Sequence, residues 1–252
     1  MEEDIGNISQ VALVTGGSRG IGRAIGLRLA REGMKVAVNY RHDAAAAEEV
    51  VGLIRDRHGE AFAVQGSVQS EPDAERIVDA AAERFGRLTV LVNNAGIIRD
   101  KYLFMMKESD WRDVIDVNFL GPLFVSRAAL RHMLEGNYGR IVNINSVSGV
   151  IGAPGQANYA ASKAAIIGFT RSLSLEVARN GITVNALAAG YVDTAMTQGF
   201  KAEARARYME RIPVRRFADS EEIAAAAAFL CSPEAGYITG QVMTVDGGVS
   251  LS

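Results

Sequence analysis

The sequence has little cysteine and histidine, which excludes two kinds of stabilising framework. One cysteine, Cys231, is present among 252 residues, so no disulfide can form within the chain. The three histidines, His42, His58 and His132, lack the spacing of metal ligands, and we expect no metal site. No stretch reaches the roughly 18 consecutive apolar residues of a membrane span, and the acidic start Met1–Asp4 does not resemble a signal peptide. The sequence therefore predicts a cytoplasmic protein with no membrane partner.

A strong excess of charge is also missing. The net charge of −2 gives no electrostatic basis for binding nucleic acid or an anionic membrane surface. With 48% hydrophobic and 22% charged residues, the chain can bury a substantial core. Because no change in composition marks a boundary, we expect residues 1–252 to form one domain.

Seven short apolar runs alternate with longer helical segments. Nearly every position in these runs is apolar, which is typical of strands covered on both faces. The predicted strands are Val11–Thr15, Lys35–Asn39, Ala61–Gln65, Thr89–Asn93, Arg140–Asn145, Thr183–Leu187 and Gln241–Val245. The predicted helices are roughly Gly20–Glu32, Asp43–His58, Glu71–Phe85, Val117–Leu134, Ala157–Arg179 and Ser220–Leu230. This alternation predicts an α/β fold: a doubly wound (Rossmann) parallel sheet of seven strands with helices on both faces.

A glycine-rich turn separates the first predicted strand from the first predicted helix. Gly16, Gly20 and Gly22 lie in this turn, with a spacing that differs from the common Gly-x-Gly-x-x-Gly fingerprint. A turn without a ligand is the alternative interpretation. The position after a strand favours a site where a dinucleotide pyrophosphate meets a helix N-terminus.

Two arginines near this turn indicate which dinucleotide is bound. A carboxylate at the end of the second strand would bind the adenosine ribose of NAD, but the sequence there contains Arg41 and has no acid before Asp43. Arg19 lies in the glycine turn itself. Guanidinium groups bind phosphate through paired donors, so the pattern favours NADP(H). The alternative is that both arginines are solvated surface charges.

Tyr159 and Lys163 are four residues apart in a predicted helix, so they share one face. At about 4 Å and an effective dielectric constant of about 20, their attraction would be about 4 kcal/mol, or roughly three pKa units. We therefore expect the ammonium group to lower the pKa of the tyrosine into a catalytic range. A lone Tyr-x-x-x-Lys is more often plain helix surface, and Ser146, at the end of a predicted strand, could simply open a turn.

In combination and in this order, these motifs resemble the short-chain dehydrogenase/reductase family across essentially the whole chain. The matching residues are Thr15–Gly22, Asn93-Asn94-Ala95-Gly96, Asn118, Ser146, Tyr159 with Lys163, and Gly190 with Thr194. Within the family, Gly155–Tyr159, Asn94–Asp100 and Val245–Gly248 are most similar to the β-ketoacyl-[acyl-carrier-protein] reductases and the related polyketide ketoreductases.

The resemblance implies an NADPH-dependent reduction of a β-keto thioester and gives four residues catalytic roles. Tyr159 would donate a proton to the substrate oxygen, and Lys163 would lower the pKa of the tyrosine and bind the nicotinamide ribose. Ser146 would hold the substrate carbonyl oxygen. Asn118 would anchor a water molecule that links Lys163 to solvent.

The resemblance also implies a cofactor site and a lid. Asn94, Ala95 and Gly96 would border the ribose, Val192 and Thr194 the carboxamide, and Ser67 would make a weaker contact with adenine than the usual acid or amide. The full expected cofactor set is Gly16, Ser18, Arg19, Gly20, Ile21, Gly22, Arg41, Ser67, Val68, Asn94, Ala95, Gly96, Tyr159, Lys163, Gly190, Val192 and Thr194. A mobile lid over about residues 195–211 would shape the substrate pocket, with Met196, Phe200 and Tyr208 as candidate liners. The resemblance implies a homotetramer, and the apolar faces of the Asn118 and Tyr159 helices would form its dimer seam.

Several alternatives stay open at this point. The same chemistry could act on a sugar, steroid or polyketide carbonyl, or the chain could be a noncatalytic NADP-binding scaffold. The thioester donor could be a carrier protein or coenzyme A, and neither acyl length nor product stereochemistry is indicated. Arginines such as Arg127, Arg131 and Arg211 could form a basic docking surface for an acidic carrier protein, or could be solvated helix faces.

Overall fold

The computed structural model describes residues 10–199 and 202–251. Its strands form one sheet in the order β3-β2-β1-β4-β5-β6-β7, and every neighbouring pair is parallel. This confirms the predicted α/β fold with a seven-stranded sheet. The strands are β1 (Val11–Val14), β2 (Lys35–Tyr40), β3 (Ala61–Gln65), β4 (Val90–Asn93), β5 (Gly139–Ser146), β6 (Ile182–Ala189) and β7 (Val242–Val245).

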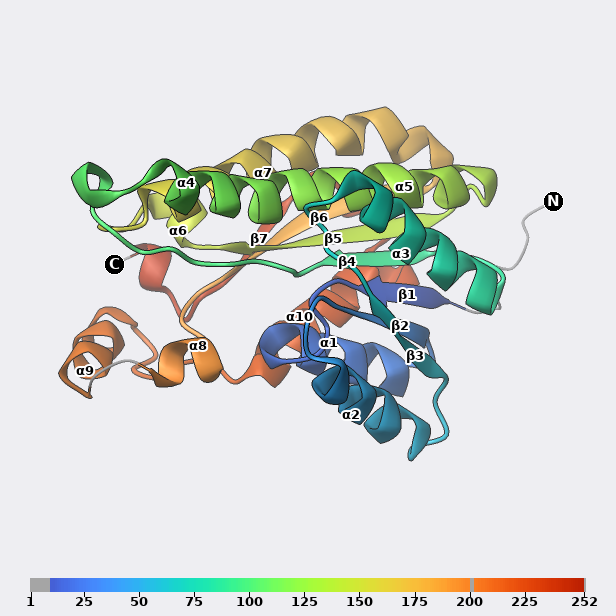
Figure 1. Cartoon of the computed structure of the whole chain (residues 1–252), viewed down its shortest axis with the longest axis horizontal. Helices are drawn as coiled ribbons and strands as arrows, with labels where there is room; N and C mark the ends of the chain where they lie inside the picture. Colours follow the sequence, from blue (N-terminus) through green and yellow to red (C-terminus); the bar gives the residue numbers. More distant parts are fainter. Residues whose placement is uncertain (1–9, 200–201, 252) are drawn as a thin grey trace.

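Helices cover both faces of the sheet (Figure 1). One face carries α1 (Gly20–Arg31), α2 (Ala44–Arg55) and α10 (Ser220–Cys231), and the other carries α3 (Glu71–Phe85), α5 (Gly121–Glu135) and α7 (Ala157–Val177). Strand β1 shows why its sequence is apolar throughout. Ala12 and Val14 pack into the core on the α1 side, whereas Val11 and Leu13 pack into the core on the α3 side. Each face therefore requires apolar side chains at alternate positions.

Polar residues and glycines set the helix ends. The Asp43 carboxylate accepts a hydrogen bond from the Ala46 N–H (3.0 Å) and caps α2. The Ser70 hydroxyl accepts a longer bond from the Asp73 N–H (3.4 Å) at the start of α3. Gly86, with a φ of 82°, follows the last residue of α3 in the left-handed conformation that glycine adopts easily. These signals explain why the predicted bounds of α2 and α3 lie close to the observed ones.

The predicted helix Val117–Leu134 is wrong as a single element. The structure has α4 (Glu108–Ile115), a π-helical turn (Asp116–Leu120) and then α5, so helix begins about nine residues earlier than predicted. The wider π turn carries Asn118, whose side chain bonds to the backbone of Ile97 outside the helix. A π turn inside a helix is rare and frequently marks a functional position.

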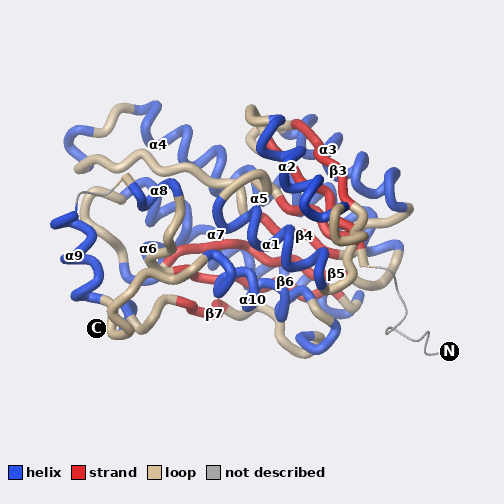
Figure 2. The backbone as a smooth tube through the Cα atoms, turned by 90° about the horizontal axis from the view of Figure 1, so that it is seen from below, coloured by secondary structure: helices blue, strands red, loops and turns tan. Residues whose placement is uncertain are grey.

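Short helices gather beyond the carboxyl ends of the central strands. Three of these are α6 (Ser148–Ile151), α8 (Ala195–Gln198) and α9 (Ala202–Arg211), which lie at the left end of the molecule in Figure 1 and again at the left in Figure 2. The remaining helical segments of the described residues are the 3₁₀ turns Leu103–Met105, Ala178–Asn180, Pro233–Ala235 and Val249–Leu251. In open parallel sheets, ligands bind at this edge.

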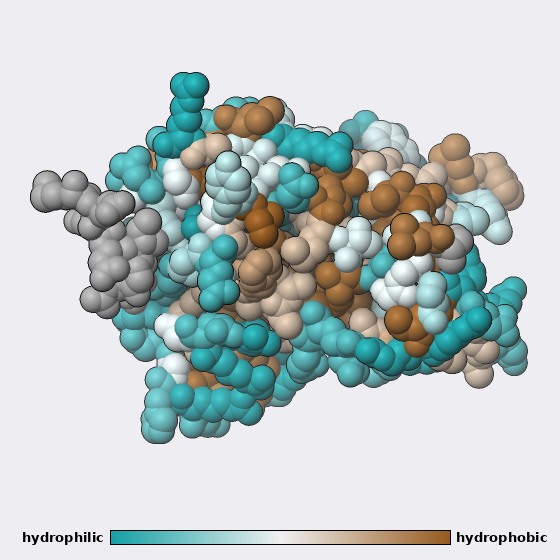
Figure 3. Space-filling view, turned by 180° about the vertical axis from the view of Figure 1, so that it is seen from behind, coloured by the Kyte–Doolittle hydropathy of each residue, from teal (hydrophilic) through white to brown (hydrophobic). Residues whose placement is uncertain are grey.

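The end of the molecule that carries α6 and α9 also exposes apolar side chains. Figure 3 shows apolar surface over this half of the rear face, and Val150, Ile151, Val214 and Leu251 are exposed. No helix among the described residues has the length and apolar composition needed to cross a membrane. Within residues 10–199 and 202–251, no group of three or more His, Cys, Asp or Glu side chains is placed to hold a metal ion.

Candidate active site

The glycine turn has the backbone geometry that a bound pyrophosphate requires. Gly16 and Gly20 adopt φ angles of 59° and 54°, a region that other residues rarely enter. A Cβ on Gly22 would overlap the Gly16 carbonyl oxygen and the Asn94 amide nitrogen. No described side chain caps the first turn of α1, and that turn contains no acidic residue. Its N–H groups and the positive end of the helix dipole are therefore available to an anion.

Asn94 fixes this turn from the neighbouring strand. Its side-chain amide donates to the carbonyl oxygens of Thr15 (2.9 Å) and Gly16 (3.0 Å). The Thr15 hydroxyl in turn accepts hydrogen bonds from the N–H groups of Asn94 (2.9 Å) and Ala95 (3.1 Å). The structure thus gives the Asn94 side chain a positioning role, whereas the sequence indicated only its place beside the ribose.

The other predicted cofactor residues surround the turn at the same edge of the sheet. Gly190 follows β6, and a Cβ there would lie 2.7 Å from the Asp246 Cα, so only glycine allows this approach. The Thr194 methyl lies 3.7 Å from the position of a Cβ on Gly20, which places the segment after β6 opposite the glycine turn. Side chains at Gly22 and Gly190 would occupy this space, which the glycines leave open. The described residues therefore fit a bound dinucleotide. Ser67 and Val68 follow β3 at this edge, with Val68 buried, whereas Gly96 is exposed.

The two arginines proposed to bind phosphate are exposed. Neither Arg19 nor Arg41 forms an ion pair with another described residue. Asp43, the first acid after β2, directs its carboxylate to the N-terminus of α2. That carboxylate is therefore engaged at the helix cap.

Tyr159 and Lys163 do lie on one face of α7, but the expected pKa of the tyrosine is wrong for the protein without cofactor. The Lys163 Nζ lies 5.7 Å from the centre of the Tyr159 ring and donates to the Ile144 carbonyl oxygen (2.8 Å). Burial raises the pKa of Tyr159 to about 12, a hydrogen bond with Ser146 opposes this rise, and the negative charge of Asp100 adds to it. Burial also lowers the pKa of Lys163 from 10.5 to about 8. Desolvation disfavours the charged form of each group and is the largest cause of both shifts.

Ser146 is the last residue of β5 and faces Tyr159. Its hydroxyl accepts a hydrogen bond from the Ser148 N–H (3.2 Å) and bonds to the tyrosine oxygen. Asn145 fixes the backbone here, because its Oδ1 accepts from the Ser146 N–H (2.8 Å). Three predicted catalytic residues, Ser146, Tyr159 and Lys163, are thus brought together beside the end of β5.

Asn118 is fully buried and joins this group through backbone contacts. Its Oδ1 accepts from the Ile97 N–H (2.8 Å), and its Nδ2 donates to the Ile97 carbonyl oxygen (3.0 Å) and the Ser162 hydroxyl (3.2 Å). The Ser162 hydroxyl donates to the Tyr159 carbonyl oxygen (2.7 Å). Both amide N–H groups of Asn118 are therefore in use, so its side chain could bind a water only through the second lone pair of Oδ1.

The described part of the segment expected to form a lid packs against the segment after β6. Tyr191 stacks on Tyr208 (4.7 Å between ring centres) and on Phe217 (5.4 Å). Arg205 pairs with Asp193 (2.7 Å) and lies 4.2 Å from the centre of the Phe217 ring. Of the three predicted liners, Tyr208 is thus placed against Tyr191. The Met196 side chain and Phe200 lie outside the described parts of the chain.

Sequence reasoning missed a group of buried polar residues under the site. Asn93 donates to Ser126 (2.9 Å) and Asn143 (2.9 Å), and Asn143 donates to Thr170 (2.9 Å). Asn145 is also buried, and its Nδ2 has no partner among the described residues. The signal was present as asparagines at alternate positions of an otherwise apolar strand, which indicates a polar stripe on one face.

A dinucleotide cradle beside a serine, a tyrosine and a buried lysine defines an α/β oxidoreductase site. Comparison with known proteins agrees. The sequence model of a family described as enoyl-(acyl carrier protein) reductase matches residues 16–250. A 3-oxoacyl-[acyl-carrier-protein] reductase of Synechocystis is 48% identical over 244 residues, which cover 96% of this chain and 98% of that protein.

Two further relatives carry the same name. The protein of Staphylococcus aureus is 46% identical, over 97% of this chain and 99% of its own length. The protein of Vibrio cholerae is 44% identical, over 96% and 98% respectively. The chain belongs to the short-chain dehydrogenase/reductase family and is an oxidoreductase of that family, whose members use a nicotinamide cofactor.

Proposed function

We propose that this protein is an NADPH-dependent reductase that converts a β-keto thioester to the β-hydroxy product. The observation that carries the proposal is the meeting of Ser146, Tyr159 and Lys163 at the sheet edge that also holds the glycine turn. The names of the relatives support the thioester as substrate.

In this proposal, the residues of the chain bind the keto group and supply its proton. Ser146 and Tyr159 hold the carbonyl oxygen by hydrogen bonds, which orients it and stabilises the negative charge that develops there. A bound NADPH would supply the hydride. With a pKa of about 12, Tyr159 keeps its proton at neutral pH and can donate it to the alkoxide oxygen, which is a stronger base than phenolate.

Lys163 would have two tasks. Its ammonium group, protonated at pH 7 with a pKa of about 8, would stabilise the phenolate that Tyr159 leaves behind. Its remaining N–H groups would bind the nicotinamide ribose. Asn118, through Ser162, would hold the first turns of α7 in place for both residues.

The choice of NADP(H) rests on Arg19 and Arg41. Both are exposed near the end of β2 and the glycine turn, and the Asp43 carboxylate that could bind a ribose is used at the cap of α2. Two guanidinium groups can bind the extra phosphate of NADP(H) through paired donors.

The reaction does not decide whether the acyl group is carried by an acyl carrier protein or by coenzyme A. Arg127 forms ion pairs with Glu71 and Glu75 on α3, and Arg131 lies 3.8 Å from both Glu75 and Asp79. These acids partly neutralise the arginines considered as a docking surface for an acidic carrier. We therefore propose that carrier-bound and coenzyme A thioesters should be compared directly.

The test is the loss of NADPH absorbance with acetoacetyl-CoA, an acetoacetyl carrier protein, crotonyl-CoA and a panel of sugar, steroid and polyketide ketones. The proposal expects the keto thioesters to be the best substrates. Faster turnover of another ketone would assign the same chemistry to a different substrate. Cofactor binding without turnover of any carbonyl compound would favour a scaffold, and preference for crotonyl-CoA would favour an enoyl reductase.

Location, domain organisation and assembly stay predictions. We propose a cytoplasmic homotetramer of single-domain subunits whose dimer seam uses α5 and α7. An exposed leucine, Leu175, lies on α7, and Trp111 and Leu134 are exposed on α4 and α5. A monomeric mass in light scattering would contradict the proposed assembly.

A further inference from the structure

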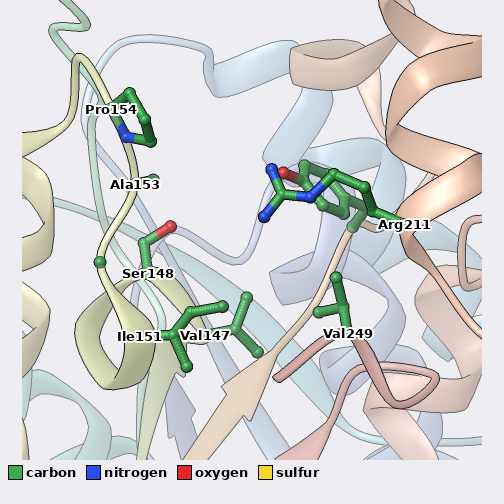
Figure 4. A pocket seen from close by; sticks show the side chains of 9 residues that line it. Val147, Ser148, Ile151, Ala153, Pro154, Arg211 and Val249 are labelled. Atoms are coloured by element: carbon green, nitrogen blue, oxygen red, sulfur yellow. The ribbon is translucent and has the colours of Figure 1, made fainter. Parts of the chain in front are cut away.

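A cavity lined by Val147 and Ser148 opens beside the end of β5, next to Ser146 in the chain. It lies between the segment that follows β5 and the segment that follows β6, and its empty space of about 330 Å³ includes the open mouth toward solvent. Val147, Ile151, Ala153 and Pro154 give it one largely apolar wall, and Ser148 lies on the same side (Figure 4). Because the Ser148 N–H bonds to the Ser146 hydroxyl, the cavity adjoins the place of the reacting carbonyl. One substituent of that carbonyl would enter it.

Arg211 forms the opposite wall together with Tyr191 and Val249. It is the only charged residue among the nine that line the cavity. Figure 4 shows its guanidinium group directed across the space toward Ser148 and Ala153. The positive charge of Arg211 opposes the rise in the pKa of Tyr191 that burial causes, so the two groups lie close together.

The position of Arg211 is set by packing in the lid. It is the last residue of α9, and the same helix carries Tyr208, which stacks on Tyr191. The ion pair between Arg205 and Asp193 joins α9 to the segment after β6 at a second point. These contacts place the end of α9, and with it Arg211, at the cavity before any substrate binds.

We propose that Arg211 is a specificity-determining residue whose guanidinium group binds an anionic group of the substrate. The inference rests on the proposed reduction of a thioester. A guanidinium group offers up to five N–H donors in a plane, and it binds the oxygens of a carboxylate or phosphate through two of them at once. Two sources of such oxygens fit: a carboxylate at the end of a short acyl chain, or a phosphate of the thioester donor.

The apolar wall complements this charge. Methylene groups next to the keto carbon would contact Val147 and Ile151, and the anionic end would reach Arg211 on the far side. A neutral substrate would use only the apolar wall. Arg211 should therefore separate anionic from neutral substrates and leave the reduction itself unaffected.

The test uses three keto thioesters with purified full-length protein. The first, the acetoacetyl thioester of N-acetylcysteamine, is neutral. The second, acetoacetyl-CoA, carries its anionic groups on the thioester donor. The third is a 3-oxoacyl thioester of N-acetylcysteamine that carries a carboxylate on the acyl chain, three carbons beyond the keto group. The variants are Arg211→Gln and Arg211→Lys. The matched control is Arg207→Gln, an exposed arginine on the same helix that does not line the cavity.

We expect Arg211→Gln to lower kcat/KM about 10- to 100-fold for an anionic substrate, mainly through KM, because a hydrogen-bonded charge pair is lost. Turnover of the neutral thioester should change less than about twofold, and Arg211→Lys should restore part of the loss, since lysine keeps the charge but not the paired donors. A loss confined to the acyl carboxylate identifies the acyl chain as the source of the anion. A loss confined to acetoacetyl-CoA identifies the donor phosphate.

The opposite results are equally clear. Equal losses on neutral and anionic thioesters, no loss on either anionic substrate, or the same losses in Arg207→Gln would overturn the role of Arg211 while leaving the proposed reductase function intact. A wild-type protein that reduces none of the three would refute the proposed function and this inference with it.

Discussion

The difference in stability between cofactor-free Lys163→Met and the wild type should favour the variant more at pH 7 than at pH 10, by about 2 kcal/mol. Lys163 is 6% exposed, and its Nζ donates to the Ile144 carbonyl oxygen and has no carboxylate partner among the described residues. Burial lowers its pKa from 10.5 to about 8. The folded protein therefore holds the charged form at a cost that methionine, of similar length, removes.

The sign and size follow from proton linkage. The folded state binds this proton more weakly than the unfolded state, so the cost is complete below pH 8 and is relieved as pH rises toward 10.5. A difference of about 2.5 pKa units corresponds to about 3 kcal/mol at pH 7 and to about 1 kcal/mol at pH 10. The advantage of Lys163→Met should therefore shrink by about 2 kcal/mol between the two pH values.

A second effect works against the variant at every pH. Methionine leaves the Ile144 carbonyl oxygen without its donor, at a cost of about 1–3 kcal/mol. This cost does not depend on the protonation of Lys163. The absolute change in stability at pH 7 is therefore small, and the change between pH values carries the test.

The assay is urea denaturation of both proteins at pH 7 and pH 10, at one protein concentration and without cofactor. All other titrating groups are shared and cancel in the difference. Lys107→Met, at an exposed position, is the control and should show little dependence on pH. A difference between wild type and Lys163→Met that is the same at both pH values, or that grows as pH rises, would refute the reasoning.

Three further substitutions test the site. Tyr159→Phe should lower kcat by about 100- to 10,000-fold while NADPH affinity, measured by fluorescence titration, stays nearly unchanged, and full activity would contradict the proton-donor role. Arg41→Asp should raise kcat/KM with NADH relative to kcat/KM with NADPH, because it replaces a guanidinium group that donates hydrogen bonds to the extra phosphate with a carboxylate that repels it. An unchanged ratio would count against the NADP(H) assignment. Gly22→Ala should destabilise the protein by about 1–3 kcal/mol and weaken cofactor binding, because its Cβ would overlap the Asn94 amide, whereas Gly52→Ala, with open space around its Cβ, should do neither.

The sheet was predictable because each strand satisfies a simple rule. A parallel strand between two helical layers must be apolar at successive positions, and runs such as Val11–Val14 meet that requirement directly. All seven predicted strands appear in the structure, although β5 and β6 are longer than predicted. The extra residues matter, since Ser146 is thereby the last residue of a strand and its backbone is held by the sheet.

Helix α4 was missed because its helical pattern is weak in the sequence. Only Asp110 and Val114 of its eight residues are buried, so no apolar stripe marks it. Asp110 instead forms polar contacts: its carboxylate accepts from the Lys107 N–H (2.9 Å) and pairs with Lys101 (2.8 Å). The Asp110 carbonyl oxygen also accepts a hydrogen bond from Asn158 on α7 (2.9 Å), a long-range contact that local sequence patterns do not reveal.

The expected pKa of Tyr159 failed for a different reason. The spacing of Tyr159 and Lys163 along the helix predicted that a positive charge lies near the tyrosine, but it did not indicate how deeply both groups are buried. In the structure the loss of solvent raises the pKa of the tyrosine and lowers that of the lysine, and each shift opposes the attraction expected from their pairing. The burial keeps Tyr159 protonated at neutral pH, which suits the proton-donor role that we propose for it.

Three features that each lower the stability of the folded protein lie close to the predicted catalytic residues. The π turn at Asn118 interrupts a helix, the Asn145 Nδ2 is buried without a described partner, and Lys163 carries a buried charge. Each costs free energy that ordinary apolar packing would avoid. Asn118 contacts Ser162, the residue before Lys163, and Asn145 holds the N–H of Ser146, so these features converge on the residues that the motifs single out. Three such costs that fall on the residues singled out by the motifs are what a catalytic site is expected to show, an argument that stands apart from the likeness to any relative.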